Sequence, residues 1–175
     1  FKQSVSDHKA LRYGENPHQD GFFFGKLKEN FEQLHGKEIS YNNLLDLDAG
    51  VNLIREFNEP TVAILKHNNA CGLASRPDLL TCWKDALAGD PVSAFGGVIM
   101  SNVQIDSASA EEINKLFFEI ILAPAYDDKA LEILKSKKNR IILVDNQPPL
   151  SDMLFRSALN GVLVQQRDQK TETAG

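Results

Sequence analysis

The sequence has 175 residues, of which 42% are hydrophobic and 25% are charged, and its formal net charge is −5. This length and composition fit one ordinary globular domain and exclude a globally disordered chain. The acidic balance argues against a dedicated nucleic-acid-binding protein, which usually carries a basic stripe. No apolar run approaches the ~18–20 residues that are needed to cross a bilayer, so no membrane association is expected.

Two cysteines are too few for a disulfide framework, so we expect a reducing, cytoplasmic environment. The chain begins at Phe1, shows no signal peptide and ends in the polar tail QQRDQKTETAG. We interpret it as a piece of a longer protein.

Strands and helices alternate along the predicted chain after a polar, turn-rich stretch over residues 1–20. In chain order the patterns predict a strand at 22–24, a helix within 39–57, a strand at 61–65, a helix at 78–88, a strand at 94–100, a helix at 107–118, a strand at 120–123, a helix within 127–138, a strand at 140–144 and a last strand ending near 166. The expected helix caps are Asn42 or Asn43 for the first helix and Asp78 for the second, which should stop at Gly89. This alternation indicates an α/β sandwich with a mostly parallel sheet.

The stretch LKHNNACG (65–72) places a cation, an imidazole and two amides directly after a buried strand. In parallel sheets ligands bind outside the carboxyl ends of the strands, so this polar cluster is expected at the ligand-facing edge. His67 can act as a general base near neutral pH, and Lys66 can stabilise developing negative charge. The alternative is an ordinary surface loop.

The same stretch can also be interpreted as a cysteine nucleophile or as a zinc site. Cys71 and His67 can be interpreted as a nucleophilic pair, although a small packed thiol is the simpler interpretation. A zinc deaminase places a Glu two residues after the His and later a Cys-x-x-Cys. Here Asn68 and Asn69 follow the His, and the two cysteines are eleven residues apart, so no metal site is predicted.

Three further segments hold candidates for ligand contacts. In LRYGENPHQ (11–19), Arg12 can bind a phosphate and Tyr13 can stack or hydrogen-bond, or the segment is only an ordered loop. In DPVSAFGGV (90–98), paired glycines allow a close approach of the backbone to a ligand, but they also form ordinary strand entries. Glu119 lies between apolar residues and can meet either a ligand or a partner cation.

Five segments occur together in a fixed order: LRYGENPHQ, KEISYNNLLDLDAG, AILKHNNACG, DPVSAFGGVI and EIILAPAYDDKAL. From about Leu11 to Asp168 the chain resembles the transformylase region of the AICAR formyltransferase/IMP cyclohydrolase family, the bifunctional enzymes of purine biosynthesis. The resemblance implies formyl transfer from the co-substrate 10-formyltetrahydrofolate to the 5-amino group of AICAR. In such bifunctional enzymes the product is then cyclised to IMP.

The same resemblance assigns roles to six residues. His67 is expected to remove a proton from the amine, and Lys66 to assist the transition state. Arg12, Tyr13, Gly96 and Glu119 are expected to bind the nucleotide. Asn42 and Asn43 lie in a matching motif without an assigned role.

The resemblance also implies a three-layer, cytidine-deaminase-like α/β lobe with a mixed, mostly parallel sheet, used without zinc. Residues 1–175 would form a single domain, the first lobe of the transformylase region, with the second lobe and the cyclohydrolase domain absent from this chain. The folate pocket would lie mostly in that second lobe, and the working enzyme would be a homodimer. We therefore expect the isolated chain to be inactive. The rival interpretations are a Cys71/His67 acyl-transfer enzyme and a non-catalytic nucleotide-binding or dimerisation module.

Overall fold

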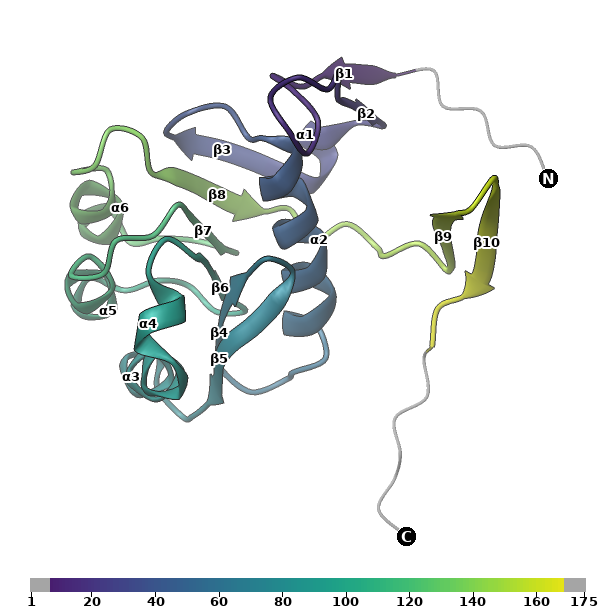
Figure 1. Ribbon diagram of the computed structural model, residues 1–175. Coiled ribbons are helices and arrows are strands. Elements are labelled where there is room, and N and C mark those ends of the chain that lie inside the picture. Colours follow the sequence, from purple (N-terminus) through teal and green to yellow (C-terminus); the bar gives the residue numbers. More distant parts are fainter. Residues whose placement is uncertain (1–6, 169–175) are drawn as a thin grey trace, which may run out of the picture.

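The protein is described by a computed structural model that covers residues 7–168 (Figure 1). Its elements are β1 (His8–Ala10), β2 (Phe22–Phe24), α1 (Leu27–Asn30), β3 (Phe31–His35), α2 (Tyr41–Ile54), β4 (Thr61–Lys66), β5 (Asn69–Ser75), α3 (Leu79–Gly89), α4 (Pro91–Ala94), β6 (Val98–Ser101), α5 (Ser107–Ile113), β7 (Ile120–Ala123), α6 (Asp128–Leu134), β8 (Ile141–Asp145), β9 (Met153–Ala158) and β10 (Gly161–Gln166). No helix among these is long and apolar enough to cross a membrane.

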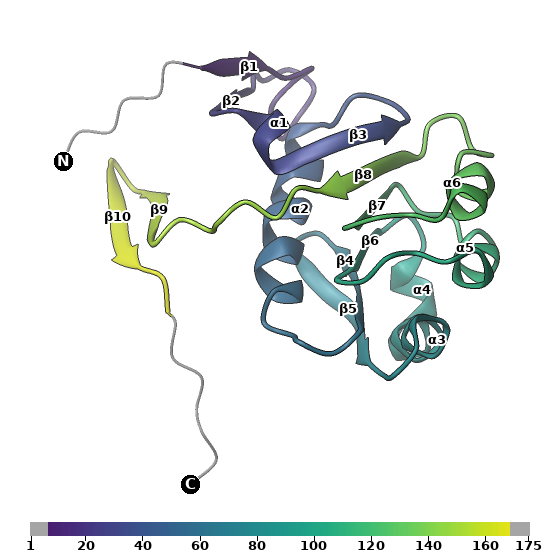
Figure 2. The same cartoon turned by 180° about the vertical axis from the view of Figure 1, so that it is seen from behind.

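A six-stranded sheet with the order β3-β8-β7-β6-β4-β5 forms the centre of the molecule. Helix α2 covers one face, and α3, α5 and α6 cover the other, as the two opposite views show (Figures 1 and 2). The three layers agree with the predicted α/β architecture. Two small antiparallel hairpins, β1–β2 and β9–β10, lie outside this sheet.

The sheet is mixed, and the prediction of a mostly parallel sheet is wrong. Only the pairs β6–β7 and β7–β8 are parallel, whereas β3–β8, β4–β6 and β4–β5 are antiparallel. The reversal arises because β4 and β5 form a hairpin, so that no helix crosses over between them. Strand β5 escaped prediction because NACGLAS lacks a continuous apolar run.

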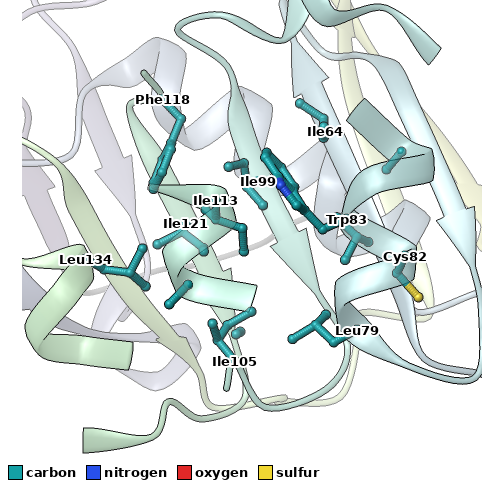
Figure 3. Packing of buried hydrophobic residues seen from close by; sticks show 14 of the residues in the cluster. Ile64, Leu79, Cys82, Trp83, Ile99, Ile105, Ile113, Phe118, Ile121 and Leu134 are labelled. Carbon is teal, nitrogen blue, oxygen red and sulfur yellow. The ribbon is translucent and has the colours of Figure 1, made fainter. Parts of the chain in front are cut away.

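The central strands bury both faces, which explains their uninterrupted apolar sequences. In β4, Val62 and Ile64 point to the helices α3 and α5, while Ala63 and Leu65 point to α2. The first cluster is built around Trp83 and Phe118, which are 2% and 1% exposed (Figure 3). Because the side chains alternate with period two, each strand contributes to both cores.

Helix α2 begins two or three residues earlier than predicted, because its N-cap is Ser40 rather than Asn42 or Asn43. The Ser40 hydroxyl accepts from the Asn43 amide, and the Asn43 side chain accepts from the Ser40 amide, which makes a reciprocal capping box. Gly50 lies inside the helix. A Cβ at Gly50 would lie 2.2 Å from the Met100 sulfur, so glycine lets α2 approach the sheet closely.

Other boundaries were predicted with mixed success. The helix capped by Asp78 is confirmed and ends at Gly89, and the strands at 22–24, 61–65, 120–123 and 140–144 are confirmed within a residue. The predicted strand at 94–100 starts only at Val98, because residues 91–94 form a short helix. The last predicted strand, ending near 166, is confirmed as β10, and a further strand, β9, precedes it.

The last two predicted helices are shorter than expected, ending at Ile113 and Leu134. Buried Arg140 lies beside both ends. Its guanidinium donates to the Leu134 carbonyl (3.0 Å) and to the Asn114 side-chain oxygen (2.7 Å), so it binds groups at the ends of two neighbouring helices.

Candidate active site

A pocket of about 450 Å³ lies at one edge of the central sheet. It forms where β4 ends and where β6 and β7 begin, because β4 runs antiparallel to β6. The prediction placed ligand chemistry at the carboxyl ends of parallel strands. Lys66 and His67 do lie at the carboxyl end of β4, but β4 pairs only with antiparallel neighbours, so the premise of parallel strands is wrong. The neighbouring strands present their amino ends to the pocket. All six predicted site residues line it, namely Arg12, Tyr13, Lys66, His67, Gly96 and Glu119.

His67 is carried by a two-residue β-turn between β4 and β5. Lys66 pairs with Asn69 across the hairpin, and the two residues between them have positive φ angles, 52° at His67 and 64° at Asn68. These are the φ values of a type I′ turn, which matches the twist of the flanking strands. The left-handed region costs most L-residues roughly 1–2 kcal/mol, although Asn visits it more readily. The turn therefore needs support from its surroundings.

Two hydrogen bonds provide this support. The Asn69 side-chain amide donates to the His67 carbonyl at 2.8 Å, within the turn itself. The Asn68 backbone N–H donates to the Asp46 carboxylate of helix α2 at 2.7 Å. The exposed His67 imidazole makes no hydrogen bond with any part of residues 7–168, so both ring nitrogens are available to a ligand.

Lys66 is the last residue of β4 and is half-buried. Its ammonium donates to the Phe95 carbonyl at 2.8 Å, in the segment that leads into β6. An ammonium has three protons, so two remain for a ligand in the pocket. This contact fixes the cation beside the turn that carries His67.

Arg12 and Tyr13 lie in the predicted loop, which closes on itself. The Leu11 amide donates to the Gly21 carbonyl and the Gly14 amide to the Gln19 carbonyl, at 2.9 and 2.7 Å. The Arg12 guanidinium lies 5.2 Å from the centre of the Tyr13 ring. Arg12 forms no ion pair with any described residue, so its charge is available to an anion.

Gly96 and Glu119 are held side by side by the backbone. The Gly96 amide donates to the Phe117 carbonyl (2.8 Å), and the Glu119 amide to the Gly97 carbonyl (3.0 Å). Gly96 has a φ of +74°, which a side chain would disfavour. The Glu119 carboxylate is about one-third exposed, at 38%, and is 3.4 Å from the Lys37 ammonium. Glu119 therefore meets a partner cation and also lines the pocket, and its contact with a ligand stays a prediction.

Eight lining residues were not predicted as site residues: Lys37, Glu38, Ser40, Asn42, Asn43, Asp46, Phe95 and Val98. Among them, Asn42, Asn43 and Asp46 come from the first two turns of α2. Asn42 donates to the Glu15 carbonyl at 3.2 Å, and Asn43 to Glu119 at a longer 3.4 Å. Three side chains of one helix thus contact three separate segments of the site. The sequence offers only a weak signal for them, because polar residues at a helix start are usually capping or solvated groups.

Cys71 does not belong to this pocket. It is the extra residue of a β-bulge, since Ile64 pairs with Gly72 and Leu65 with Ala70. Its thiol donates to the Ile64 carbonyl at 3.4 Å and packs against the core beneath α3. Burial raises the pKa of Cys71, which disfavours the thiolate that a nucleophile needs. The packed-thiol interpretation fits this geometry better than a Cys–His pair.

The pocket combines charges of both signs with the His67 imidazole, a base that no described residue engages in a hydrogen bond. Three cations (Arg12, Lys37 and Lys66) face three carboxylates (Glu38, Asp46 and Glu119) across it. The N-terminus of α2, which favours negative charge, also opens into it. Within residues 7–168 no group of three or more His, Cys, Asp or Glu side chains is placed to hold a metal ion. The arrangement suits a polar ligand with an anionic group and a proton to lose.

Comparison with known proteins gives a consistent result. The family model described as "AICARFT/IMPCHase bienzyme" matches residues 1–175. The chain is 65% identical over 173 residues to the bifunctional purine biosynthesis protein PurH of Bacteroides thetaiotaomicron, covering 99% of this chain and 34% of that protein. It is 43% identical to PurH of Caldicellulosiruptor saccharolyticus over 93% of the chain and 34% of that protein. PurH of Lacticaseibacillus casei is 41% identical over 99% of the chain and 36% of its own length. The chain thus spans about a third of the length of these curated relatives.

Proposed function

The chain belongs to the AICARFT/IMPCHase bienzyme family, and on this premise we propose that it supplies the catalytic edge of the formyl-transfer site. The reaction is transfer of a formyl group from 10-formyltetrahydrofolate to the 5-amino group of AICAR. The observation that carries the proposal is the convergence of Lys66 and His67 with four nucleotide-binding candidates in one pocket.

The chemistry follows from the residues. The amine of AICAR is a poor nucleophile, because its lone pair is conjugated with a carboxamide-bearing ring. His67 takes a proton from it as the nitrogen attacks the formyl carbon. Negative charge then develops on the formyl oxygen, and the Lys66 ammonium stabilises it. Breaking the bond to the folate nitrogen, which takes up a proton, releases tetrahydrofolate and formyl-AICAR.

The remaining lining residues are assigned to the nucleotide. Arg12 pairs with the phosphate, Tyr13 adds a hydrogen bond or a stacking surface, and Gly96 and Glu119 contact the rest of the nucleotide. The loop that carries Arg12 is tied to α2 through Asn42, so the phosphate-binding and catalytic parts share one support.

We further propose that the chain is the first, deaminase-like lobe of the transformylase region and that it works without zinc. The reduced folate would bind largely to a second lobe, in a homodimer whose subunits share sites, and the cyclohydrolase reaction that forms IMP would belong to another domain. The isolated chain should then lack turnover, and measurable formyl transfer by residues 1–175 alone would contradict this part of the proposal.

The central test uses a chimera in which residues 1–175 replace the matching third of the Bacteroides thetaiotaomicron protein. Formyl transfer from 10-formyltetrahydrofolate to AICAR is measured for this chimera and for its His67→Ala variant. Removing a general base should lower kcat by about 10²–10⁴-fold. A folded chimera that binds AICAR equally well with and without His67, and that transfers no formyl group, would instead support a nucleotide-binding module.

A further inference from the structure

The turn that carries His67 has a single external anchor in the described structure. Residues 67 and 68 make one hydrogen bond to an element outside their own hairpin, and its acceptor is the Asp46 carboxylate (2.7 Å from the Asn68 nitrogen). Both turn residues occupy the left-handed region without being glycine. Such conformations persist only where the surroundings over-determine them, so this anchor matters more than an ordinary surface contact.

The other end of the anchor is rigid. Asp46 precedes Leu47, which is fully buried at 0% exposure in the core between α2 and the sheet. The helix is also fixed at its start by the capping box of Ser40 and Asn43. A packed helix therefore holds the carboxylate, whereas the turn itself is exposed. The charge of the carboxylate strengthens its hydrogen bond with the backbone amide.

We propose that Asp46 is a positioning residue, which holds the Asn68 amide and so fixes the direction in which His67 enters the pocket. This inference rests on the proposed function, because the orientation of His67 matters for catalysis only if His67 acts on a bound substrate. Small misplacements of a catalytic group are expensive, since a shift of about 1 Å can cost on the order of 10²-fold in rate.

Asp46 also lines the pocket, so two other roles must be separated from positioning. A direct contact with substrate would change KM when the side chain is removed. A purely electrostatic effect on His67 would be lost in Asp46→Asn, which removes the charge. Positioning alone is retained in Asp46→Asn, because the amide oxygen can still accept from Asn68.

The activity test compares Asp46→Ala, Asp46→Asn and the control Asp48→Ala in the chimera described above. Asp48 is an exposed residue of the same helix and does not line the pocket. Asp46→Ala should lower kcat at least about tenfold with KM for AICAR within about twofold, while Asp46→Asn stays within about threefold of wild type. The proposal is overturned if Asp46→Ala keeps its kcat, if the two variants are equally impaired, or if only KM rises.

A second readout does not depend on formyl transfer. Amide hydrogen exchange of Asn68 is measured by NMR on the 175-residue chain and on its Asp46→Ala and Asp46→Asn variants. Asp46→Ala should accelerate exchange at Asn68 at least about tenfold, with buried strand amides such as Ile99 unchanged. If Asp46→Ala accelerates exchange at Asn68 while every chimera lacks activity, the proposed function fails, but the role of Asp46 in holding the turn is supported. Unchanged exchange at Asn68 in Asp46→Ala would show that the hydrogen bond to Asp46 does not hold the turn, and would overturn the proposal.

Discussion

Helix α3 closely approaches the sheet at Gly72 on strand β5. A Cβ built at Gly72 would lie 2.0 Å from the Ala86 carbonyl oxygen and 2.9 Å from its carbon. A Cβ atom essentially never lies within 3.0 Å of a non-bonded atom, so in Gly72→Ala the helix and the strand must part by about 1 Å or more. The neighbouring residues Cys82 and Trp83 are buried in the core and cannot follow such a shift without leaving gaps.

We expect Gly72→Ala to lower the free energy of unfolding by at least about 2 kcal/mol, toward the upper end of overpacking costs. Urea denaturation measures this loss, and the fluorescence of Trp83, the one tryptophan of the sequence, reports on α3 directly. Gly161→Ala is the matched control, because its Cβ would be 3.8 Å from the nearest atom, the Ala158 oxygen. If the two variants agreed within about 0.5 kcal/mol, the close approach of α3 to β5 would be refuted.

Two further predictions follow from buried polar groups. The Tyr126 hydroxyl donates to the Leu143 carbonyl at 2.8 Å, and burial raises the pKa of Tyr126 well above its usual value. Its stabilising contribution is therefore full below about pH 10 and is lost as the pH rises further, because the unfolded chain ionises first. Urea denaturation should show wild type losing more stability than Tyr126→Phe above that pH, and parallel losses would contradict the assignment. For Cys71→Ser we expect formyl transfer by the chimera within about twofold of wild type, since the thiol lies outside the pocket. Near-complete loss of activity would instead support Cys71 as a nucleophile paired with His67.

Much of the fold could be read from local patterns. TVAIL was identifiable because a strand buried on both faces is short and apolar throughout, and Asp78 was identifiable because it caps a helix with apolar periodicity. The direction of the strands was not readable. The hairpin that reverses the chain uses His67 and Asn68 at positions where Asn-Gly is the usual signal, so the turn resembled an irregular loop.

The site shows the same division between local and tertiary information. His67, Lys66 and Arg12 stood out because their chemistry is conspicuous next to turns and strand ends. Asp46 did not, because an Asp in the pattern LLDLD has the appearance of a solvated helix face. Its partner is an amide 22 residues later in the sequence, and only the packing of α2 against the sheet brings the two together.

The shortness of the β4–β5 connection limits how this region can vary in length. Only two residues join the paired strands, so an inserted or deleted residue cannot be accommodated without changing the turn or the strand pairing. One added residue would change the turn type or move the whole of β5 by one register position, which would turn its inward side chains outward. The loop at 11–21, which is closed by its own hydrogen bonds and lies outside the central sheet, carries no such restriction. A change of length in the loop that carries Arg12 would therefore leave the register of the central sheet intact, whereas a change of length in the turn that carries His67 would not.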